Sequence, residues 1–208
     1  MKLLILGVTG GTGQQLVAQS LEQHHEVTAL VRNPSKLRLS HEKLVVVKGN
    51  VLDEDVLLKA LEGKEAVLSA LGVGTSLKSS NLISKAVSTL IPAMHTTGVK
   101  RVIFLSAFGV GETFVQASFI QKILFQLLLK DIYADKAKGD EQLRNSTLDW
   151  TLVYPVLLTN GPRTGKYKVG EKLPMKGMPK ISRADVADFM LQQLTHPTFL
   201  RKEPLIMG

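Results

Sequence analysis

The sequence predicts an α/β fold: a single Rossmann-like, doubly wound parallel sheet with helices on both faces. A short apolar run at 3–6 breaks directly into glycines and is followed by an amphipathic helix pattern. Apolar runs then alternate with helical patterns to the end of the chain, as is typical of parallel strands joined by crossover helices. With 208 residues, no internal repeat and no linker-like stretch, we expect residues 1–208 to form one domain.

The expected strands are short apolar runs that end at glycine, proline or polar residues. In chain order they cover residues 3–6, 26–31, 44–47, 66–71, 101–106, 150–154 and 204–207. Proline ends the sixth of these runs at Pro155. Right-handed crossovers bring the carboxyl ends of the first, fourth and fifth strands to one edge of the sheet, which is where such folds bind ligands.

The expected helices carry apolar residues at helical spacing. Asp53 and Ser182 precede two of them and are predicted N-caps, for helices at 53–61 and 184–194. A long helix at 81–96 should break or kink near Pro92, and 114–143 should be helical with an interruption. Residues 119–129 within it are unusually apolar, which favours a packed core helix but also fits a flap over a substrate or a subunit contact.

The glycine turn after the first strand is the strongest functional signal. Gly7, Gly10 and Gly13 stand three apart, between a strand and a helix, which is the context of a dinucleotide-binding turn. There the glycines allow a tight turn, close approach of backbone N–H groups to a pyrophosphate, and close packing of helix on strand. The partial positive charge of the helix N-terminus also favours the pyrophosphate.

The residue after the second strand predicts which dinucleotide is bound. Arg32 lies 19 residues after Gly13, where an NAD site usually places an acid for the ribose 2′-hydroxyl. A guanidinium can instead pair with a 2′-phosphate through two hydrogen bonds. We therefore expect NADP(H) as the cofactor.

Composition excludes several other classes of function. The chain has no cysteine, which excludes disulfides and thiolate ligands, and its five histidines form no metal-spaced cluster, so we expect no metal site. No apolar run is long enough to span a bilayer, and the N-terminal run stops too early for a signal peptide. We expect a cytoplasmic protein without a membrane or nucleic-acid partner.

The net charge of +8 is concentrated near the C-terminus. Residues 163–183 contain seven basic residues and the single acid Glu171, with Tyr167 as the only aromatic, so the stacking residues of a single-strand binder are missing. This segment either faces an anionic small molecule or is a solvated loop. In the first case Lys166 and Lys168, two apart in an extended stretch, would hold acid groups of that molecule.

Six short motifs are spread along the whole chain in a characteristic order. They are Gly7-Val-Thr-Gly-Gly-Thr-Gly13, Val31-Arg32, Gly49-Asn-Val-Leu-Asp53, Gly98-Val-Lys-Arg-Val102, Leu148-Asp-Trp-Thr-Leu-Val-Tyr-Pro155 and Ile181-Ser-Arg-Ala-Asp-Val-Ala187. Together they resemble the atypical, NmrA-like short-chain dehydrogenase/reductase superfamily. The chain length, Ser106-Ala-Phe108 and the stretch after Thr164 are most similar to its biliverdin-IXβ reductase/flavin reductase branch.

The chain departs from this superfamily in its catalytic Tyr-x-x-x-Lys motif. If Lys136 is that lysine, the tyrosine position holds Ile132, and Tyr133 is one residue off although it shares a helix face with Lys136. A misplaced tyrosine argues against carbonyl reduction, which needs a proton donor at the oxygen. Flavins and linear tetrapyrroles accept hydride at a conjugated centre, so the broken motif favours the reductase branch.

The resemblance implies a role for each remaining position in the site. The pyrophosphate would bind the glycine turn, the adenine would lie near Asn50 and Val51, and the nicotinamide side would lie near Leu71 and Gly72. Ser106 would hydrogen-bond near the nicotinamide or the acceptor. The implied cofactor-turn residues are Gly7, Thr9, Gly10, Gly11, Thr12 and Gly13, and the implied substrate residues are Ala107, Phe108, Pro155, Lys166 and Lys168.

The expected function is thus NADPH-dependent hydride transfer to a flavin (FMN or FAD as substrate), a tetrapyrrole or a quinone, by a monomer or homodimer. Two alternatives stay open. One is reduction or epimerisation of another carbonyl or quinone substrate, with Tyr133 or no acid at all. The other is an interaction protein that binds NADP(H) without turnover.

Overall fold

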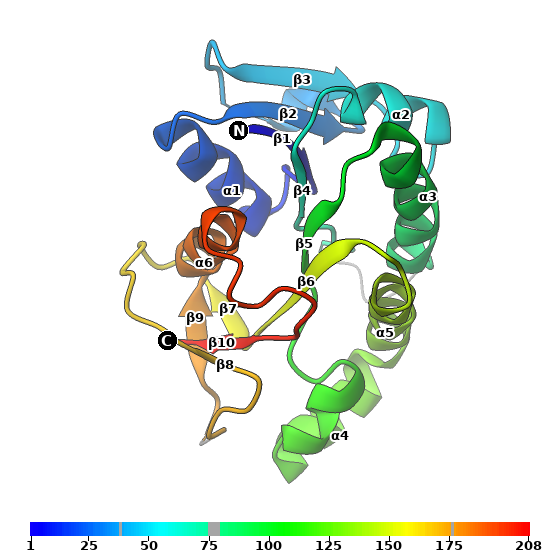
Figure 1. Ribbon diagram of the computed structural model, residues 1–208. Helices are drawn as coiled ribbons and strands as arrows, with labels where there is room; N and C mark the ends of the chain where they lie inside the picture. The colour runs from blue at the N-terminus through cyan, green and yellow to red at the C-terminus, as the bar shows by residue number, and fades with distance from the viewer. Residues whose placement is uncertain (38, 75–79, 176) are drawn as a thin grey trace.

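The strands form a mostly parallel sheet with the order of a dinucleotide-binding fold. In the computed structural model, residues 1–37, 39–74, 80–175 and 177–208 are described. The eight-stranded sheet has the order β3-β2-β1-β4-β5-β6-β10-β8 (Figure 1). Its strands are β1 (Lys2–Leu6), β2 (Glu26–Val31), β3 (Leu44–Lys48), β4 (Ala66–Ser69), β5 (Arg101–Leu105), β6 (Asp149–Pro155), β8 (Lys168–Gly170) and β10 (Leu205–Met207). The order reverses between β1 and β4, so their carboxyl ends border the crevice where such folds bind ligands.

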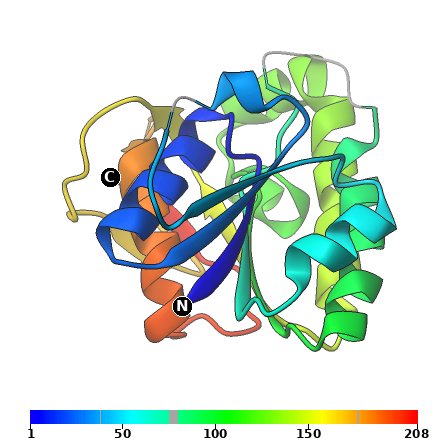
Figure 2. The ribbon, with the colours of Figure 1, turned by 90° about the horizontal axis from the view of Figure 1, so that it is seen from above.

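Helices cover both faces of this sheet, as the alternating pattern predicted. On one face α1 (Gly11–Glu22) packs against α6 (Arg183–Thr195). On the other, α3 (Leu82–Thr97) packs against both α2 (Glu54–Leu61) and α5 (Lys130–Arg144) (Figures 1 and 2). The central strands supply the core: Leu3, Leu4 and Ile5 of β1 are fully buried, as are the apolar residues of β4. Strands buried on both faces read as continuous apolar runs, which is why the sequence located them.

Both predicted helix caps are confirmed. The Asp53 carboxylate accepts a hydrogen bond from the Val56 N–H at 3.2 Å, and the Ser182 hydroxyl accepts one from the Asp185 N–H at 2.9 Å. Each side chain satisfies one of the N–H groups that a helix start leaves without a partner.

Several expected boundaries were wrong. Helix α3 continues through Pro92 instead of breaking there, and Pro155 belongs to β6, where it pairs with Ile206. The segment at 114–143 is helical with interruptions, as predicted, and comprises η2 (Gly111–Gln116), α4 (Phe119–Leu128) and α5. The core assignment for the apolar helix was also wrong in part, because Ile123, Leu127 and Leu128 of α4 are exposed.

Three short strands were not predicted. Strand β8 pairs antiparallel with β10 at the edge of the large sheet. Strands β7 (Leu157–Thr159) and β9 (Lys180–Ser182) form a separate parallel pair. A three-residue strand carries too few positions to show a period of two, and its partner is set by packing.

Candidate functional site

The turn between β1 and α1 contains backbone contacts so close that only glycine fits at two of its positions. Gly7 has a positive φ of 76°, and a Cβ on it would lie 2.4 Å from the carbonyl oxygen of Ala70. A Cβ on Gly13 would lie 2.1 Å from the oxygen of Gly7, so helix α1 packs directly on the turn. The Gly10 N–H donates to that same oxygen at 3.1 Å. This geometry fits the expected pyrophosphate site: bare backbone at a helix N-terminus.

Thr9 and Thr12 flank the central glycines of this turn. Thr9 is exposed beside it, and Thr12 is buried in the first turn of α1. The Gln14 side-chain amide donates to the Thr9 carbonyl at 3.4 Å, a weak contact across the turn. Thr9 is thus the more accessible of the two to a bound phosphate.

The residues expected at the adenine end lie at the ends of β2 and β3, which pair in parallel. Arg32 directly follows β2 and is exposed, and over the described ranges its side chain makes no hydrogen bond or ion pair. Asn50 follows β3 by two residues, and its side-chain oxygen accepts from the Leu52 N–H at 3.2 Å. That contact orients the Asn50 amide, while the neighbouring Val51 side chain is buried. A guanidinium without a protein anion beside it suits a phosphate ligand.

Leu71 and Gly72 follow β4 at the same sheet edge, where Leu71 is half-buried and Gly72 is exposed. A Cβ on Gly72 would meet no atom within 4 Å, so this stretch is open above the backbone. Residues 75–79, which continue this loop, lie outside the described residues.

Ser106 lies at the end of β5 and is held there by the neighbouring strand. Its N–H donates to the Val153 carbonyl at 2.8 Å, and the Phe108 N–H donates to the Pro155 carbonyl at 3.0 Å. The pairing of β5 with β6 therefore continues beyond the strand. It places Ser106, Ala107 and Phe108 beside Pro155, so four expected site residues do meet.

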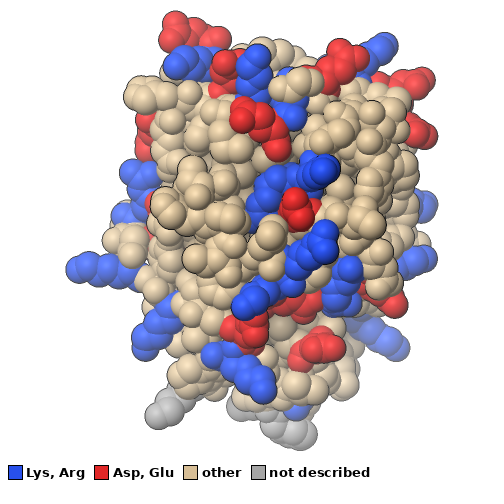
Figure 3. Space-filling view, viewed as in Figure 1, with Lys and Arg blue, Asp and Glu red and all other residues tan. Residues whose placement is uncertain are grey.

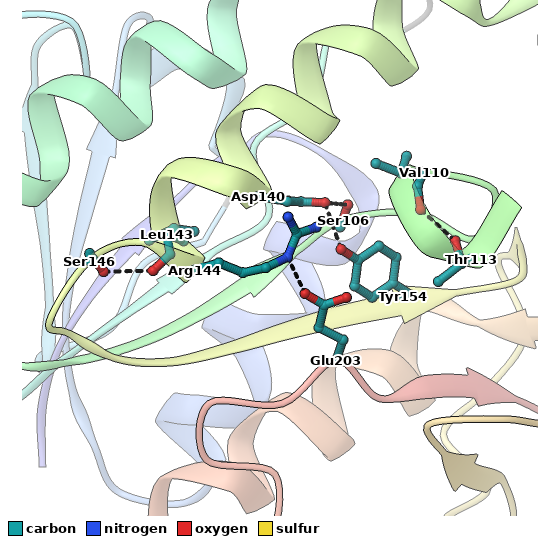
Figure 4. A network of polar contacts seen from close by, with 9 residues as sticks. All are labelled: Ser106, Val110, Thr113, Asp140, Leu143, Arg144, Ser146, Tyr154 and Glu203. Atoms are coloured by element: carbon teal, nitrogen blue, oxygen red, sulfur yellow. Dashed lines mark hydrogen bonds and ion pairs between the residues drawn. The ribbon is translucent and has the colours of Figure 1, made fainter.

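The buried carboxylate of Asp140 contacts the Ser106 side chain (Figure 4). The Ser106 hydroxyl donates to Asp140 Oδ2 at 2.6 Å, and the Tyr154 hydroxyl donates to the same oxygen at 2.9 Å. Asp140 is completely buried, and no described residue hydrogen-bonds to its other oxygen. Burial raises the pKa of Asp140, opposed by the Ser106 hydrogen bond and the nearby Lys136 charge. Because Ser106 donates inward, its oxygen is left to accept a hydrogen bond from a ligand.

Asp140 was not predicted from the sequence, although a signal was present. It stands four residues after Lys136, so the two share one face of α5. An acid on the inward face of a helix is rarely there without a partner. The partners Ser106 and Tyr154 come from two strands and could not be identified from spacing.

Lys136 and Tyr133 of α5 both donate hydrogen bonds to main-chain carbonyls, one at the end of β5 and one just after it. Lys136 Nζ donates to the Leu105 carbonyl at 3.1 Å, and the Tyr133 hydroxyl donates to the Phe108 carbonyl at 3.1 Å. Burial lowers the pKa of Lys136 and raises the pKa of Tyr133 to about 12. A lysine cation close to a tyrosine would lower the tyrosine pKa instead. The pair is thus not arranged as an activated proton donor.

A cavity of about 250 Å³ opens beside Ser106, between the end of β5 and helix α4. Its walls are mostly apolar and aromatic, and Ser106, Gln121 and Tyr133 carry its polar side-chain groups. The rings of Phe125 and Tyr133 pack against each other with centroids 5.1 Å apart and planes tilted by 46°. The cavity is lined by Ser106, Ala107, Phe108, Gln121, Phe125, Leu129, Tyr133, Pro155, Val156, Leu157, Leu158, Met178 and Pro179.

The basic segment reaches this cavity through apolar residues. Met178 and Pro179, in the loop between β8 and β9, line it, whereas Lys166 and Lys168 are exposed and are not among the lining residues. Lys168 begins β8 opposite Met207. Residue 176 of this loop lies outside the described residues. Charges of both signs are interspersed over the face shown in Figure 3, and neither sign covers it alone.

Two other classes of site are absent from the part of the chain that the structure describes. Within residues 1–37, 39–74, 80–175 and 177–208, no group of three or more acidic or histidine side chains could hold a metal ion. None of the helices described there is both long and apolar enough to cross a bilayer.

Comparison with known proteins shows which protein family the chain matches. Residues 7–197 match the model of a protein family described as NAD(P)H-binding. The chain is 28% identical to YhfK of Bacillus subtilis, named an uncharacterized sugar epimerase, over 93% of this chain and 88% of that protein. It is 32% identical to the photosystem II assembly factor Ycf39 of Synechocystis, over 100% of this chain but only 63% of that protein.

Among solved structures, the chain is similar to ChuY, an anaerobilin reductase from Escherichia coli O157:H7. The TM-score is 0.83 at 21% sequence identity, with 100% of this chain and 97% of that chain covered. At this identity the similarity shows a shared fold. This NAD(P)H-binding family also supports the expected cofactor, NADP(H).

Proposed function

Because the chain belongs to the family of NAD(P)H-binding proteins, we propose that it is a reductase that transfers hydride from NADPH to a flavin or a linear tetrapyrrole. The observation that carries the proposal is the cavity beside Ser106. It lies at the end of β5, two strands from the glycine turn after β1, so a ligand in it lies about 10 Å along the sheet edge from the turn.

Different residues of the chain suit different parts of the cofactor and the substrate. The bare backbone at Gly7–Gly13 suits the pyrophosphate, and the exposed Arg32 suits the 2′-phosphate. Ser106, whose proton is held by Asp140, presents an acceptor oxygen to an N–H group of the nicotinamide or of the substrate ring. NADPH, when bound, supplies the hydride, so the contribution of the protein is mainly positioning.

The cavity favours a flat, conjugated substrate. Phe108, Phe125 and Tyr133 offer aromatic surface on its walls, and its 250 Å³ is below the usual volume for a whole ligand, so it accommodates part of such a substrate. The structural neighbour ChuY is named an anaerobilin reductase, which supports a linear tetrapyrrole as the class of substrate.

The state of Tyr133 argues for a substrate that needs no acid from the protein. Its hydroxyl proton is directed at the Phe108 carbonyl, and its pKa is raised to about 12. A general acid at neutral pH works best with a pKa near 7. A reduced flavin or tetrapyrrole can take its proton from water after hydride transfer.

The first test is NADPH oxidation with a panel of FMN, riboflavin, biliverdin, quinones and nucleotide sugars. The proposal expects steady turnover with a flavin or with biliverdin. Turnover confined to quinones or sugars would contradict it, and so would tight NADPH binding with no turnover on any of them. The last result would favour a non-catalytic, NADP(H)-sensing role.

A matched pair of variants tests the cavity itself. Leu129 lines the cavity, whereas Leu127, two residues earlier, is 76% exposed and is not among the lining residues. We expect Leu129→Arg to raise the KM for the acceptor at least tenfold with an unchanged Kd for NADPH, and Leu127→Arg to change neither. Equal effects of the two substitutions on the KM would show that the acceptor binds outside this cavity.

A second candidate function is reduction or epimerisation of a carbonyl substrate. The observation that favours it is that Tyr133 and Ser106 line the same cavity, so a substrate oxygen could reach both hydroxyl groups. The relative YhfK is named as a sugar epimerase, which fits this class. It requires Tyr133 to give up its contact with the Phe108 carbonyl and Ser106 its contact with Asp140, because a carbonyl oxygen only accepts hydrogen bonds.

A further inference from the structure

The Arg183 side chain lies across the glycine turn. Arg183 is the first residue of α6, and Gly11 is the first residue of α1, the helix against which α6 packs. A Cβ built on Gly11 would lie 2.7 Å from Arg183 Cδ and 3.0 Å from its Nε. The arginine therefore occupies the space that a side chain at position 11 would need. At position 11 a glycine leaves room for a neighbouring side chain, and no positive φ calls for it.

The guanidinium is held in this position without being neutralised. Its Nη1 donates to Asn160 Oδ1 at 2.7 Å, and this amide is its only hydrogen-bond or ion-pair partner within the described ranges. The start of α6 is itself firmly anchored, because the Asp185 carboxylate accepts from the Thr164 and Gly165 N–H groups at 2.6 and 2.9 Å. A positioned cation without a protein anion thus lies beside the start of α1.

We propose that Arg183 is a cofactor-binding residue whose guanidinium pairs with the pyrophosphate of the dinucleotide. The cradle at Gly7–Gly13 brings backbone donors to that group, and Arg183 adds a charge that backbone N–H groups lack. Asn160 accepts a hydrogen bond from Nη1 alone, which leaves the other N–H groups of the guanidinium for the ligand. The inference rests on the NAD(P)H binding of the family and not on the proposed acceptor, so failure of the acceptor assay leaves its test intact.

The role of Arg183 differs from that of Arg32 in a measurable way. Pyrophosphate is common to NADPH and NADH, whereas the 2′-phosphate is present only in NADPH. Loss of Arg183 should therefore weaken both cofactors by the same factor, and loss of Arg32 should weaken NADPH alone.

The experiment is a fluorescence titration of the whole chain with NADPH and with NADH, at low and at high salt. Arg183→Gln should raise both dissociation constants about tenfold, the usual size for a charge-assisted contact, and the effect should shrink with salt. Arg163→Gln is the matched control, because Arg163 pairs at 3.2 Å with Glu22 at the opposite end of α1. It removes the same charge and should leave both constants unchanged.

A double-mutant cycle with Gly11 provides a second, geometric test. Gly11→Ala should push the Arg183 side chain out of place and weaken binding of both cofactors, while in an Arg183→Ala background it should cost little more. Strong coupling of this kind would support the proposal. Additive losses would contradict it, as would an Arg183→Gln variant that binds like wild type, binds like Arg163→Gln, or loses affinity for NADPH alone.

Discussion

The closest backbone contact in the candidate site predicts that two glycine substitutions in the same turn differ strongly in their effects on stability and on NADPH affinity. A Cβ on Gly13 would lie 2.1 Å from the Gly7 oxygen and 2.7 Å from the Gly7 carbonyl carbon and Val8 Cα. All three atoms are backbone, so no side-chain rotation relieves the overlap. A Cβ on Gly10 would lie 3.4 Å from the same oxygen, an ordinary contact, and Gly10 has a φ of −81° that alanine adopts freely.

The magnitude follows from these distances. Relief of the Gly13 overlap requires α1 to move away from the turn by more than about 1 Å, so we expect a cost of about 3 kcal/mol, the upper end for overpacking. For a chain of this length that lowers the Tm by roughly 6–12 °C. Gly10→Ala should cost about 1 kcal/mol or less, from the loss of a preferred N-cap residue.

The assay is thermal unfolding of both variants without cofactor, followed by NADPH titration. A shift of about 1 Å in a positioned group typically costs about 10²-fold, so Gly13→Ala should lose NADPH affinity on that order. If Gly13→Ala unfolds at the same temperature as Gly10→Ala and binds NADPH like wild type, the direct packing of α1 on the turn is refuted.

The remaining predictions concern single charges and protons. Arg32→Asp should abolish or reverse a preference for NADPH over NADH of about tenfold or more, and equal dissociation constants in the unchanged protein would contradict this. Tyr133→Phe should leave flavin reduction within a few-fold, because a general acid is typically worth about 10²–10⁴-fold, and a loss of that size in the kcat would assign it as proton donor. Lys166→Glu combined with Lys168→Glu should raise the KM for FMN, less so at high salt, and hardly change that for riboflavin, which lacks the phosphate. Burial raises the folded-state pKa of Asp140 above its unfolded value of about 3.9, so its ionisation destabilises the fold as pH rises through that interval. Asp140→Asn removes this loss, and urea denaturation at several pH values should show the variant gaining stability relative to wild type as pH rises from about 4.

Sequence reasoning identified those features of this protein whose signal is local. The apolar run that ends at Gly7 and the helix that begins at Gly11 are neighbours in the chain, so both glycine spacing and strand length could be read directly. The caps Asp53 and Ser182 act three residues away, within one turn of helix. Arg32 could be located because the length of one β-α-β unit is nearly constant.

Tertiary structure alone decided which distant side chains meet. Asp140 joins Ser106 and Tyr154 from 34 and 14 residues away, and Arg183 meets Gly11 across two packed helices. Helix α4 has an apolar composition that suits a core, yet its outer face is exposed because it covers a cavity rather than the sheet. The hydrophobic period specifies which face of an element is buried, but the element buried against it depends on how the whole sheet twists and packs.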